Sequence, residues 1–234
     1  MTPADPLRLL GVEIAACARC PRLCAWCAEV ARVKRRAYRD EEYWGRPVAG
    51  FGDPAARMLV VGLAPGAHGA NRTGRVFTGD SSGDFLYRAL HETGYANQPT
   101  STHAGDGLQL TGAWVSAAAR CAPPDNRPTP EELANCRTFL RRELELLRQL
   151  RVVVALGRIG FEAYLALLRE RGIIAAPSAL KFAHGAEYAL PGAPVLIASY
   201  HPSRQNTQTG RLTAGMLRGV FEQARAHTHP AGLA

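Results

Sequence analysis

No stretch of this chain of 234 residues approaches the roughly 18 consecutive apolar residues of a membrane-spanning helix. The first ten residues also lack the charged start and apolar centre of a signal peptide. We therefore expect a soluble, cytoplasmic protein without membrane contacts. The glycine patterns of phosphate-loop ATPases and dinucleotide-binding proteins are missing, as is the HxE and PCxxC pair of zinc deaminases. These classes of enzyme are therefore weak hypotheses.

Lysine is scarce, and arginine supplies most of the positive charge. The formal net charge of the chain is +8. Such an excess favours a polyanionic partner, for example nucleic acid. One segment mixes cations with aromatic side chains, and it contains Lys34, Arg35, Arg36, Tyr38, Arg39, Tyr43 and Trp44.

Hydrophobic residues form 47% of the chain, which is ample for the core of one domain over residues 1–234. Helical patterns separate several short apolar runs, and the clearest helix starts with a capping box at Thr129 and Glu132. This alternation predicts a three-layer α/β/α sandwich with a four-stranded parallel central sheet, against which residues 1–50 form an arm of helix and loop. The predicted strands are residues 58–61, 113–117, 152–156 and 195–199.

The segment at residues 62–80, GLAPGAHGANRTGRVFTGD, directly follows the first predicted strand and contains five glycines. Glycine lets a ligand approach backbone N–H groups, and open α/β sheets bind ligands at the carboxyl ends of their strands. We therefore expect this loop to line a binding site. The alternative is that this segment is a long connecting loop without a function of its own.

A second polar segment follows the fourth predicted strand, where His201 precedes the donor-rich residues 202–211. In a parallel sheet this segment lies at the same edge as residues 62–80, so we expect the two to form one pocket. Residues 121–128 leave the second strand at that edge and bring Asn126 to it. A lone histidine is often only structural, but the adjacent loop favours a functional role here.

Six cysteines in a cytosolic protein indicate metal binding or redox chemistry rather than disulfides. A CxxC pair at Cys17 and Cys20 precedes a second pair, Cys121 and Cys136, by about a hundred residues. Four thiolates suit a structural zinc ion or an iron–sulfur cluster, and the residues alone do not separate the two. For Cys136 the alternative is a buried core thiol.

The other two cysteines, Cys24 and Cys27, complicate the choice of ligands. On one continuous helix they would share a face with Cys17 and Cys20, but that row is too long to surround one ion. Pro21 interrupts the segment and favours a compact turn at 17–20.

Five segments of the chain together resemble the family 5 (type B) uracil-DNA glycosylases, within the uracil-DNA glycosylase superfamily. The segments occur in the family's order and cover nearly the whole chain. They are CARCPRL at 17–23, GLAPGAHGANRTGRVFTGD at 62–80, RCAPPDNRPTPEE at 120–132, ALGRIG at 155–160 and HPSRQNTQTGRLT at 201–213.

The resemblance implies the uracil-DNA glycosylase fold, with a four-stranded parallel sheet and an N-terminal iron–sulfur arm. It also implies removal of uracil, and of hypoxanthine or xanthine, from DNA by a monomer. One structural four-iron four-sulfur cluster is expected, with Cys24 and Cys27 as additions that could act as substitute ligands. The implied ligands are Cys17, Cys20, Cys121 and Cys136.

The resemblance also assigns roles in holding the base, which must be flipped out of the DNA stack before its bond to the sugar is reached. Phe77 would stack on the extruded base, with the backbone of Gly66 and Ala67 bounding the pocket. His201 would donate a hydrogen bond to O2 of the leaving base. For Phe77 the alternative is a place in the hydrophobic core.

The residue that activates water must differ from that of the family 4 enzymes, because Leu63 stands where they have a glutamate. Asp80 is the best carboxylate, either positioning water or stabilising the cationic sugar, and the alternative is a cap for the following helix. Asn126 would hold the water. Ala117 stands where family 4 has an asparagine that reads uracil, which predicts a looser pocket that admits other damaged bases.

Further residues are expected to contact DNA, although exposed arginines are often only solvated. The residues expected in the minor groove are Arg204, Gln205 and Asn206, and Ser203 is expected to contact DNA beside them. The expected phosphate clamps are Arg72, Arg75 and Arg211. Two rival hypotheses are a noncatalytic nucleic-acid-binding protein stabilised by iron–sulfur or zinc, and an iron–sulfur electron carrier.

Overall fold

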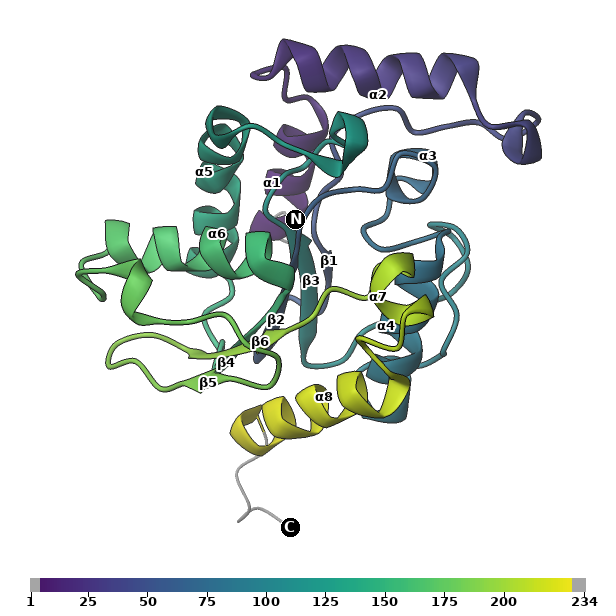
Figure 1. The fold of residues 1–234 in the computed structure, drawn as a ribbon. Helices are drawn as coiled ribbons and strands as arrows, with labels where there is room; N and C mark the ends of the chain where they lie inside the picture. Colours follow the sequence, from purple (N-terminus) through teal and green to yellow (C-terminus); the bar gives the residue numbers. More distant parts are fainter. Residues whose placement is uncertain (1–4, 229–234) are drawn as a thin grey trace.

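The computed structural model describes residues 5–228, which build one mixed sheet with the strand order β1-β3-β2-β4-β6-β5 (Figure 1). The four central strands are parallel and lie where the apolar runs predicted strands. They are β2 (Met58–Gly62), β3 (Ala113–Ala117), β4 (Val152–Leu156) and β6 (Val195–Ser199).

Antiparallel strands extend this sheet at both edges, so the prediction of a sheet of four parallel strands was wrong. β1 (Phe51–Gly52) pairs with β3, and β5 (Glu187–Tyr188) pairs with β6. Each edge strand has two residues. A strand of this length has no alternation of apolar and polar residues by which it can be recognised.

Helices cover both faces of the sheet, which confirms the three-layer arrangement (Figure 1). Successive residues of β2 therefore both meet apolar partners: Val60 packs in one core with Phe221, and Val61 packs in the other core with Phe161. Burial on both faces explains the continuous apolar runs. The covering helices are α5 (Pro130–Leu146) and α6 (Gly157–Glu170) on one face, and α4 (Ser81–Glu92) and α8 (Ala214–Thr228) on the other.

The N-terminal arm consists of helix and loop, as predicted. It comprises α1 (Pro6–Ala15), α2 (Pro21–Val33) and the 3₁₀ helix η1 (Arg36–Tyr38). Arg22 of α2 pairs with Glu132 at 2.7 Å, and Glu132 also completes the predicted capping box with Thr129. The capping box thus both starts α5 and attaches the arm to it.

Short helices follow three of the parallel strands at their carboxyl ends and place polar side chains along that edge. They are α3 (Ala70–Thr73) after β2, η2 (Pro124–Asn126) after β3 and α7 (Arg204–Gln208) after β6. A further 3₁₀ helix, η3 (Pro177–Ala179), follows α6. Within residues 5–228 no helix has the length and hydropathy to cross a bilayer.

Candidate active site

The loop at residues 62–80 folds an aromatic ring onto the end of β2. Phe77 has a φ of 51°, in the left-handed region that is uncommon for a bulky residue. A Cβ atom on Gly62 would collide with the Phe77 ring, and one on Gly83 would collide with the Phe77 carbonyl. Two of the glycines near this loop are therefore required by the close approach of Phe77.

His201 lies at the carboxyl end of β6 and faces the same ring. The centroids of Phe77 and His201 are 5.7 Å apart, and their planes are inclined by 31°. Burial lowers the pKa of His201 to about 4, so the imidazole is neutral at pH 7. A neutral imidazole keeps one N–H donor and one acceptor nitrogen. The predicted convergence of the loops after β2 and β6 is therefore confirmed.

Asp80 caps α4, as the structural alternative proposed, and its carboxylate also lines the site. Its Oδ1 accepts hydrogen bonds from the N–H groups of Ser82 and Gly83, each at 3.0 Å. A Cβ atom on Gly69 would collide with Oδ2, so glycine lets this oxygen lie against the loop. Burial raises the pKa of Asp80, and the two backbone hydrogen bonds oppose that rise.

These residues surround one cavity of about 600 Å³ at the carboxyl edge of the sheet. Eight residues predicted from the sequence line it, namely Gly66, Phe77, Asp80, Asn126, His201, Ser203, Arg204 and Gln205. The lining also includes Leu63 and Ala64 from the loop at residues 62–80, and Ser81, Ser82 and Asp125, none of which was named as a site residue. Asp125 and Asn126 both have positive φ, a conformation that Asp and Asn tolerate, and the pair of such residues is a signal that was available in the sequence.

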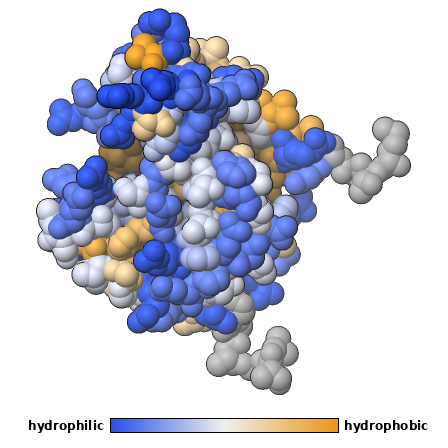
Figure 2. All heavy atoms as spheres, turned by 90° about the vertical axis from the view of Figure 1, so that its right-hand side faces the viewer, coloured by the Kyte–Doolittle hydropathy of each residue, from blue (hydrophilic) through white to orange (hydrophobic). Residues whose placement is uncertain are grey.

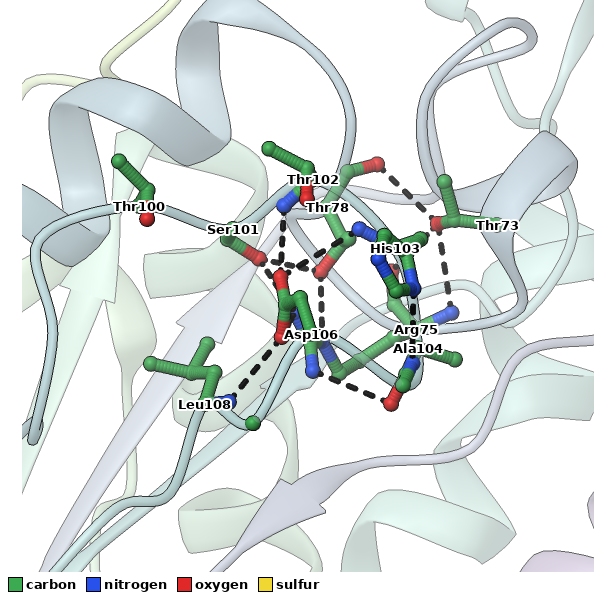
Figure 3. Close-up of polar contacts among 12 residues, drawn as sticks. Thr73, Arg75, Thr78, Thr100, Ser101, Thr102, His103, Ala104, Asp106 and Leu108 are labelled. Carbon is green, nitrogen blue, oxygen red and sulfur yellow. Dashed lines mark hydrogen bonds and ion pairs between the residues drawn. The ribbon is translucent and has the colours of Figure 1, made fainter.

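Arg75, predicted to bind phosphate, is instead buried, and its polar contacts are with the protein itself (Figure 3). Its Nη2 is 2.7 Å from Oδ2 of Asp106, and both side chains are buried. Its Nε donates to Thr78 Oγ1 at 2.9 Å, and Thr78 Oγ1 is 2.7 Å from Ser101 Oγ. The network joins the loop that carries Phe77 to residues 101–106. Phosphate contact by Arg75 would require this ion pair to break.

Arg72 is likewise buried, with 8% of its side chain exposed, and forms a short ion pair with Glu41. Its Nε donates to the carbonyl of His68, and its Nη2 donates to that of Gly79, each at 2.9 Å. The guanidinium therefore links two points of the loop at residues 62–80 rather than facing solvent. An arginine is expected to be exposed unless a partner is known, and the partner of Arg72, Glu41, lies 31 residues away in the sequence.

Three other predicted residues are not part of the cavity lining. Ala67 packs toward the cysteine-containing cluster that includes Cys27 and Cys121. Asn206 Nδ2 donates to the carbonyl of His201 at 2.8 Å. Arg211 is exposed and lies over the ring of Tyr200, 4.6 Å from its centroid.

A larger cavity, of about 910 Å³, lies between α6 and residues 177–182. Ion pairs of Arg137 with Glu170 and of Arg158 with Glu162 cross its lining, so much of its charge is internally balanced. Its lining includes none of the predicted site residues. The chemistry of the side chains therefore favours the smaller cavity as the active site.

The six cysteines gather between α2, the end of β3 and α5. Cys20, Cys27, Cys121 and Cys136 are buried. The thiols of Cys27 and Cys121 are in contact. A hydrogen bond between them is the main cause that raises the pKa of Cys121, and burial is the second cause. Backbone N–H of Arg120 donates to Cys136 Sγ at 3.4 Å, and Asn135 Nδ2 donates to Cys20 Sγ at 3.6 Å. In the part of the chain that the structure describes, no three Cys, His, Asp or Glu side chains are close enough to hold a single metal ion.

Comparison with known sequences identifies the class to which this fold and site belong. The sequence model of the uracil DNA glycosylase superfamily matches residues 49–225, from just before β1 into α8. This range includes every residue that lines the 600 Å³ cavity.

Individual relatives narrow the class. A type-5 uracil-DNA glycosylase of Thermus thermophilus is 57% identical over 91% of this chain and 94% of its own length. One of Mycobacterium leprae is 50% identical over 92% of this chain and 93% of its own. A type-4 uracil-DNA glycosylase of Archaeoglobus fulgidus is 35% identical over only 47% of this chain and 48% of its own. The chain belongs to the type-5 uracil-DNA glycosylase family, which confirms the resemblance.

Proposed function

We propose that this protein hydrolyses the N-glycosidic bond of uracil in DNA and leaves an abasic site. One observation carries the proposal: Phe77 and His201, with ring centroids 5.7 Å apart, line one cavity together with Asp80. A volume of about 600 Å³ is within the range of small-molecule sites and leaves room for one extruded base. The family relatives bear the same activity in their names.

In the proposed reaction the base leaves the stack and enters the cavity. The ring of Phe77 stacks on it, and the neutral imidazole of His201 donates a hydrogen bond to O2. As the bond between the base and C1′ breaks, negative charge develops on the base and positive charge on the sugar. One preorganised donor to the developing charge stabilises the transition state by about 3–4 kcal/mol.

Asp80 stabilises the cationic sugar or orients the attacking water. The two carboxylate oxygens of Asp80 have different surroundings: Oδ1 caps α4, whereas Oδ2 lies against Gly66 and Gly69. Asn126 lines the same cavity and holds the water from the opposite loop. Water then adds to C1′ and loses its proton, and the departing base takes up a proton.

Three apolar positions support a wider range of bases than uracil. Leu63 and Ala64 line the cavity without offering a polar group to a base, and Ala117 ends β3 as a buried methyl group. A pocket with apolar side chains at these positions has fewer polar groups there to reject a base of different hydrogen-bonding pattern, although His201 still donates to the base. We therefore extend the proposal to hypoxanthine and xanthine, to be tested by excision of each base opposite each of the four normal bases.

The cysteines suit a four-iron four-sulfur cluster held by Cys17, Cys20, Cys121 and Cys136. Three of these sulfurs accept N–H donors at 3.4–3.6 Å, the type of contact that tunes cluster thiolates. Four thiols from three chain segments match the donor set that such a cluster requires. When bound, the cluster would brace α2 against β3 and α5.

The enzyme hypothesis is tested by incubating the protein with uracil-containing duplex DNA and cleaving abasic sites with alkali. Strand breaks at uracil are expected, and their absence would leave only a noncatalytic DNA-binding protein. Asp80→Asn keeps an oxygen that caps α4 but removes the charge, so it should slow single-turnover excision by about 100-fold or more without a change in melting temperature. An unchanged rate would reject the role of Asp80. Asp80→Ala, which also removes the cap, should lower the melting temperature as well.

The cluster is tested by measuring iron and visible absorption in purified protein. Cys121→Ser should lose both, whereas Cys24→Ser should retain them. If Cys27→Ser also loses iron while Cys17→Ser keeps it, the ligand set is different from the proposed one and includes Cys27. Full retention of four irons in Cys121→Ser would reject the proposed ligands.

A further inference from the structure

A group of cations projects where α2 ends, and we call Lys34, Arg35, Arg36 and Arg39 the basic tip. Lys34 stops the helix with a φ of 57°, and its N–H still bonds to the carbonyl of Val30. The left-handed residue turns the chain sharply into η1, and Arg35, Arg36 and Arg39 are all exposed beyond it. The turn thus presents three guanidinium groups to solvent over a short length of chain.

The nearby carboxylates leave part of this charge uncompensated. Asp40 lies 3.7 Å from Arg39, and Glu41 pairs with the buried Arg72 instead of the tip. Glu42 is exposed beside them. Within residues 5–228, neither Arg35 nor Arg36 forms an ion pair, so both guanidinium groups remain free to bind an external anion.

The basic tip is attached rigidly to the active-site loop through Arg72. The ring of Tyr38 in η1 covers the Arg72 guanidinium, with Cζ 4.0 Å from the ring centroid. Arg72 holds two carbonyls of the loop at residues 62–80, and its own carbonyl accepts from the N–H of Trp44 at 2.9 Å. These contacts tie the tip and the segment that follows it to the loop that carries Phe77.

A second connection runs through Tyr43 and His68. The Tyr43 hydroxyl is 3.1 Å from His68 Nδ1 and also accepts from the Arg35 N–H at 3.5 Å. Burial lowers the pKa of His68, and the nearby Arg35 and Arg72 lower it further, so this histidine is neutral and adds no charge of its own. Arg35 is therefore two hydrogen bonds away from a residue of the active-site loop.

The tip and the other DNA-facing loop share one side of the molecule. η1 and α7 both lie at the right of Figure 1, on the side that faces the viewer in Figure 2. That face is mostly hydrophilic, and its most hydrophilic region lies toward the top of Figure 2, at the level of α2 and η1. A polyanion that enters the cavity beside α7 can thus extend over the tip.

We infer that Arg35 and Arg36 of the basic tip bind phosphates of the DNA strand that flanks the extruded nucleotide, with Arg72 as the buried residue that positions the tip. The inference rests on the proposed function for the direction in which the DNA lies. It replaces Arg72 and Arg75 as phosphate contacts with residues whose charge is exposed. Each phosphate contact displaces condensed counterions, so it contributes about 0.9 to the slope of log affinity against log salt.

The test measures binding of a fluorescent duplex with a tetrahydrofuran abasic analogue by anisotropy over a series of salt concentrations. The double variant Arg35→Ala/Arg36→Ala should reduce the salt slope by about 1.8, which makes the loss of affinity between about 50 and about 200 mM salt about tenfold smaller. Arg35→Lys/Arg36→Lys should keep the slope, because lysine retains the charge.

The matched control is Arg148→Ala/Arg151→Ala, which removes the same charge from exposed positions at the opposite, amino edge of the sheet. Its slope should equal that of the unmodified protein. If both double variants lower the slope equally, only net charge matters and the inference fails. Uracil excision by the unmodified protein is measured separately, so excision with an unchanged slope in Arg35→Ala/Arg36→Ala rejects the tip alone. A changed slope without excision rejects the proposed function alone.

Discussion

The two loops that meet at the cavity are built in opposite ways. In the loop at residues 62–80 the long polar side chains turn inward, where Arg72 and Arg75 bond to the protein itself. In the loop at residues 201–211, Arg204, Gln205 and Arg211 are exposed. The first loop uses its charges to hold a shape, and the second offers its polar groups to whatever lies outside.

This difference matches two requirements of acting on a base in duplex DNA. A stacking platform must be held in place before the base arrives, because disorder at the reacting centre costs catalysis. Phe77, in a left-handed conformation, would relax without the buried network around it. Residues that enter the groove must instead reach and adapt, which exposed side chains on a short helix can do.

The largest effect is expected when Arg75 loses the buried carboxylate of Asp106. Asp106→Ala leaves the Arg75 guanidinium buried without its charge partner, which should lower the free energy of unfolding by about 3–5 kcal/mol. Urea unfolding followed by fluorescence measures this. The control is Glu145→Ala, which breaks the exposed i,i+4 pair with Arg141 and should cost about 0.5 kcal/mol or less. Equal effects of the two substitutions would contradict the structural role of the network.

That network also shows where sequence analysis reached its limit. The apolar runs predicted the central strands because buried parallel strands must be hydrophobic on both faces, and strand ends predicted which loops converge. Asp106 could not be predicted as the partner of Arg75, because this ion pair depends on the path of a loop 31 residues further along the chain. Phe77 and His201 were predictable through position and resemblance. The burial of Arg72 and Arg75 was not predictable, because a sequence pattern does not show which charged side chains are buried on folding.

The next largest effect concerns the hydrogen bond to the leaving base. His201→Ala should slow single-turnover excision of uracil by about 100-fold to 1,000-fold, as expected for one preorganised donor. Because burial holds the pKa of His201 at about 4, the imidazole is neutral throughout neutral pH. The ratio of the two rates should therefore stay constant between about pH 6 and about pH 8. A ratio that changes near the ordinary histidine pKa would show that the protonated imidazole is the active form.

A smaller effect is expected on stability at acidic pH, where the buried carboxylate of Asp106 becomes protonated. Burial alone would raise the pKa of Asp106, but hydrogen bonds from Arg75 and from two backbone N–H groups lower it from 3.8 to about 2. The stabilisation is therefore complete above the ordinary pKa and is lost as pH falls toward 2. Compared with Asp106→Asn, which cannot titrate, the unmodified protein should lose about 2 kcal/mol of relative stability between about pH 5 and about pH 2. A difference that is constant with pH would contradict the lowered pKa.

The smallest effect is expected in the outward-facing loop, where Gln205 is exposed and lines the mouth of the cavity. If its side chain fills the gap left by the extruded base, Gln205→Ala should slow excision from a uracil–adenine pair by about two-fold to ten-fold, which corresponds to one net hydrogen bond. The loss should be smaller for a uracil–guanine mismatch, which opens more easily, and absent in single-stranded DNA, where there is no gap to fill. An equal loss on all three substrates would place Gln205 in the chemistry rather than in the opening of the duplex. The loops at residues 62–80 and 201–211 would then both take part in the chemistry, contrary to the division between a rigid loop and an outward-facing loop.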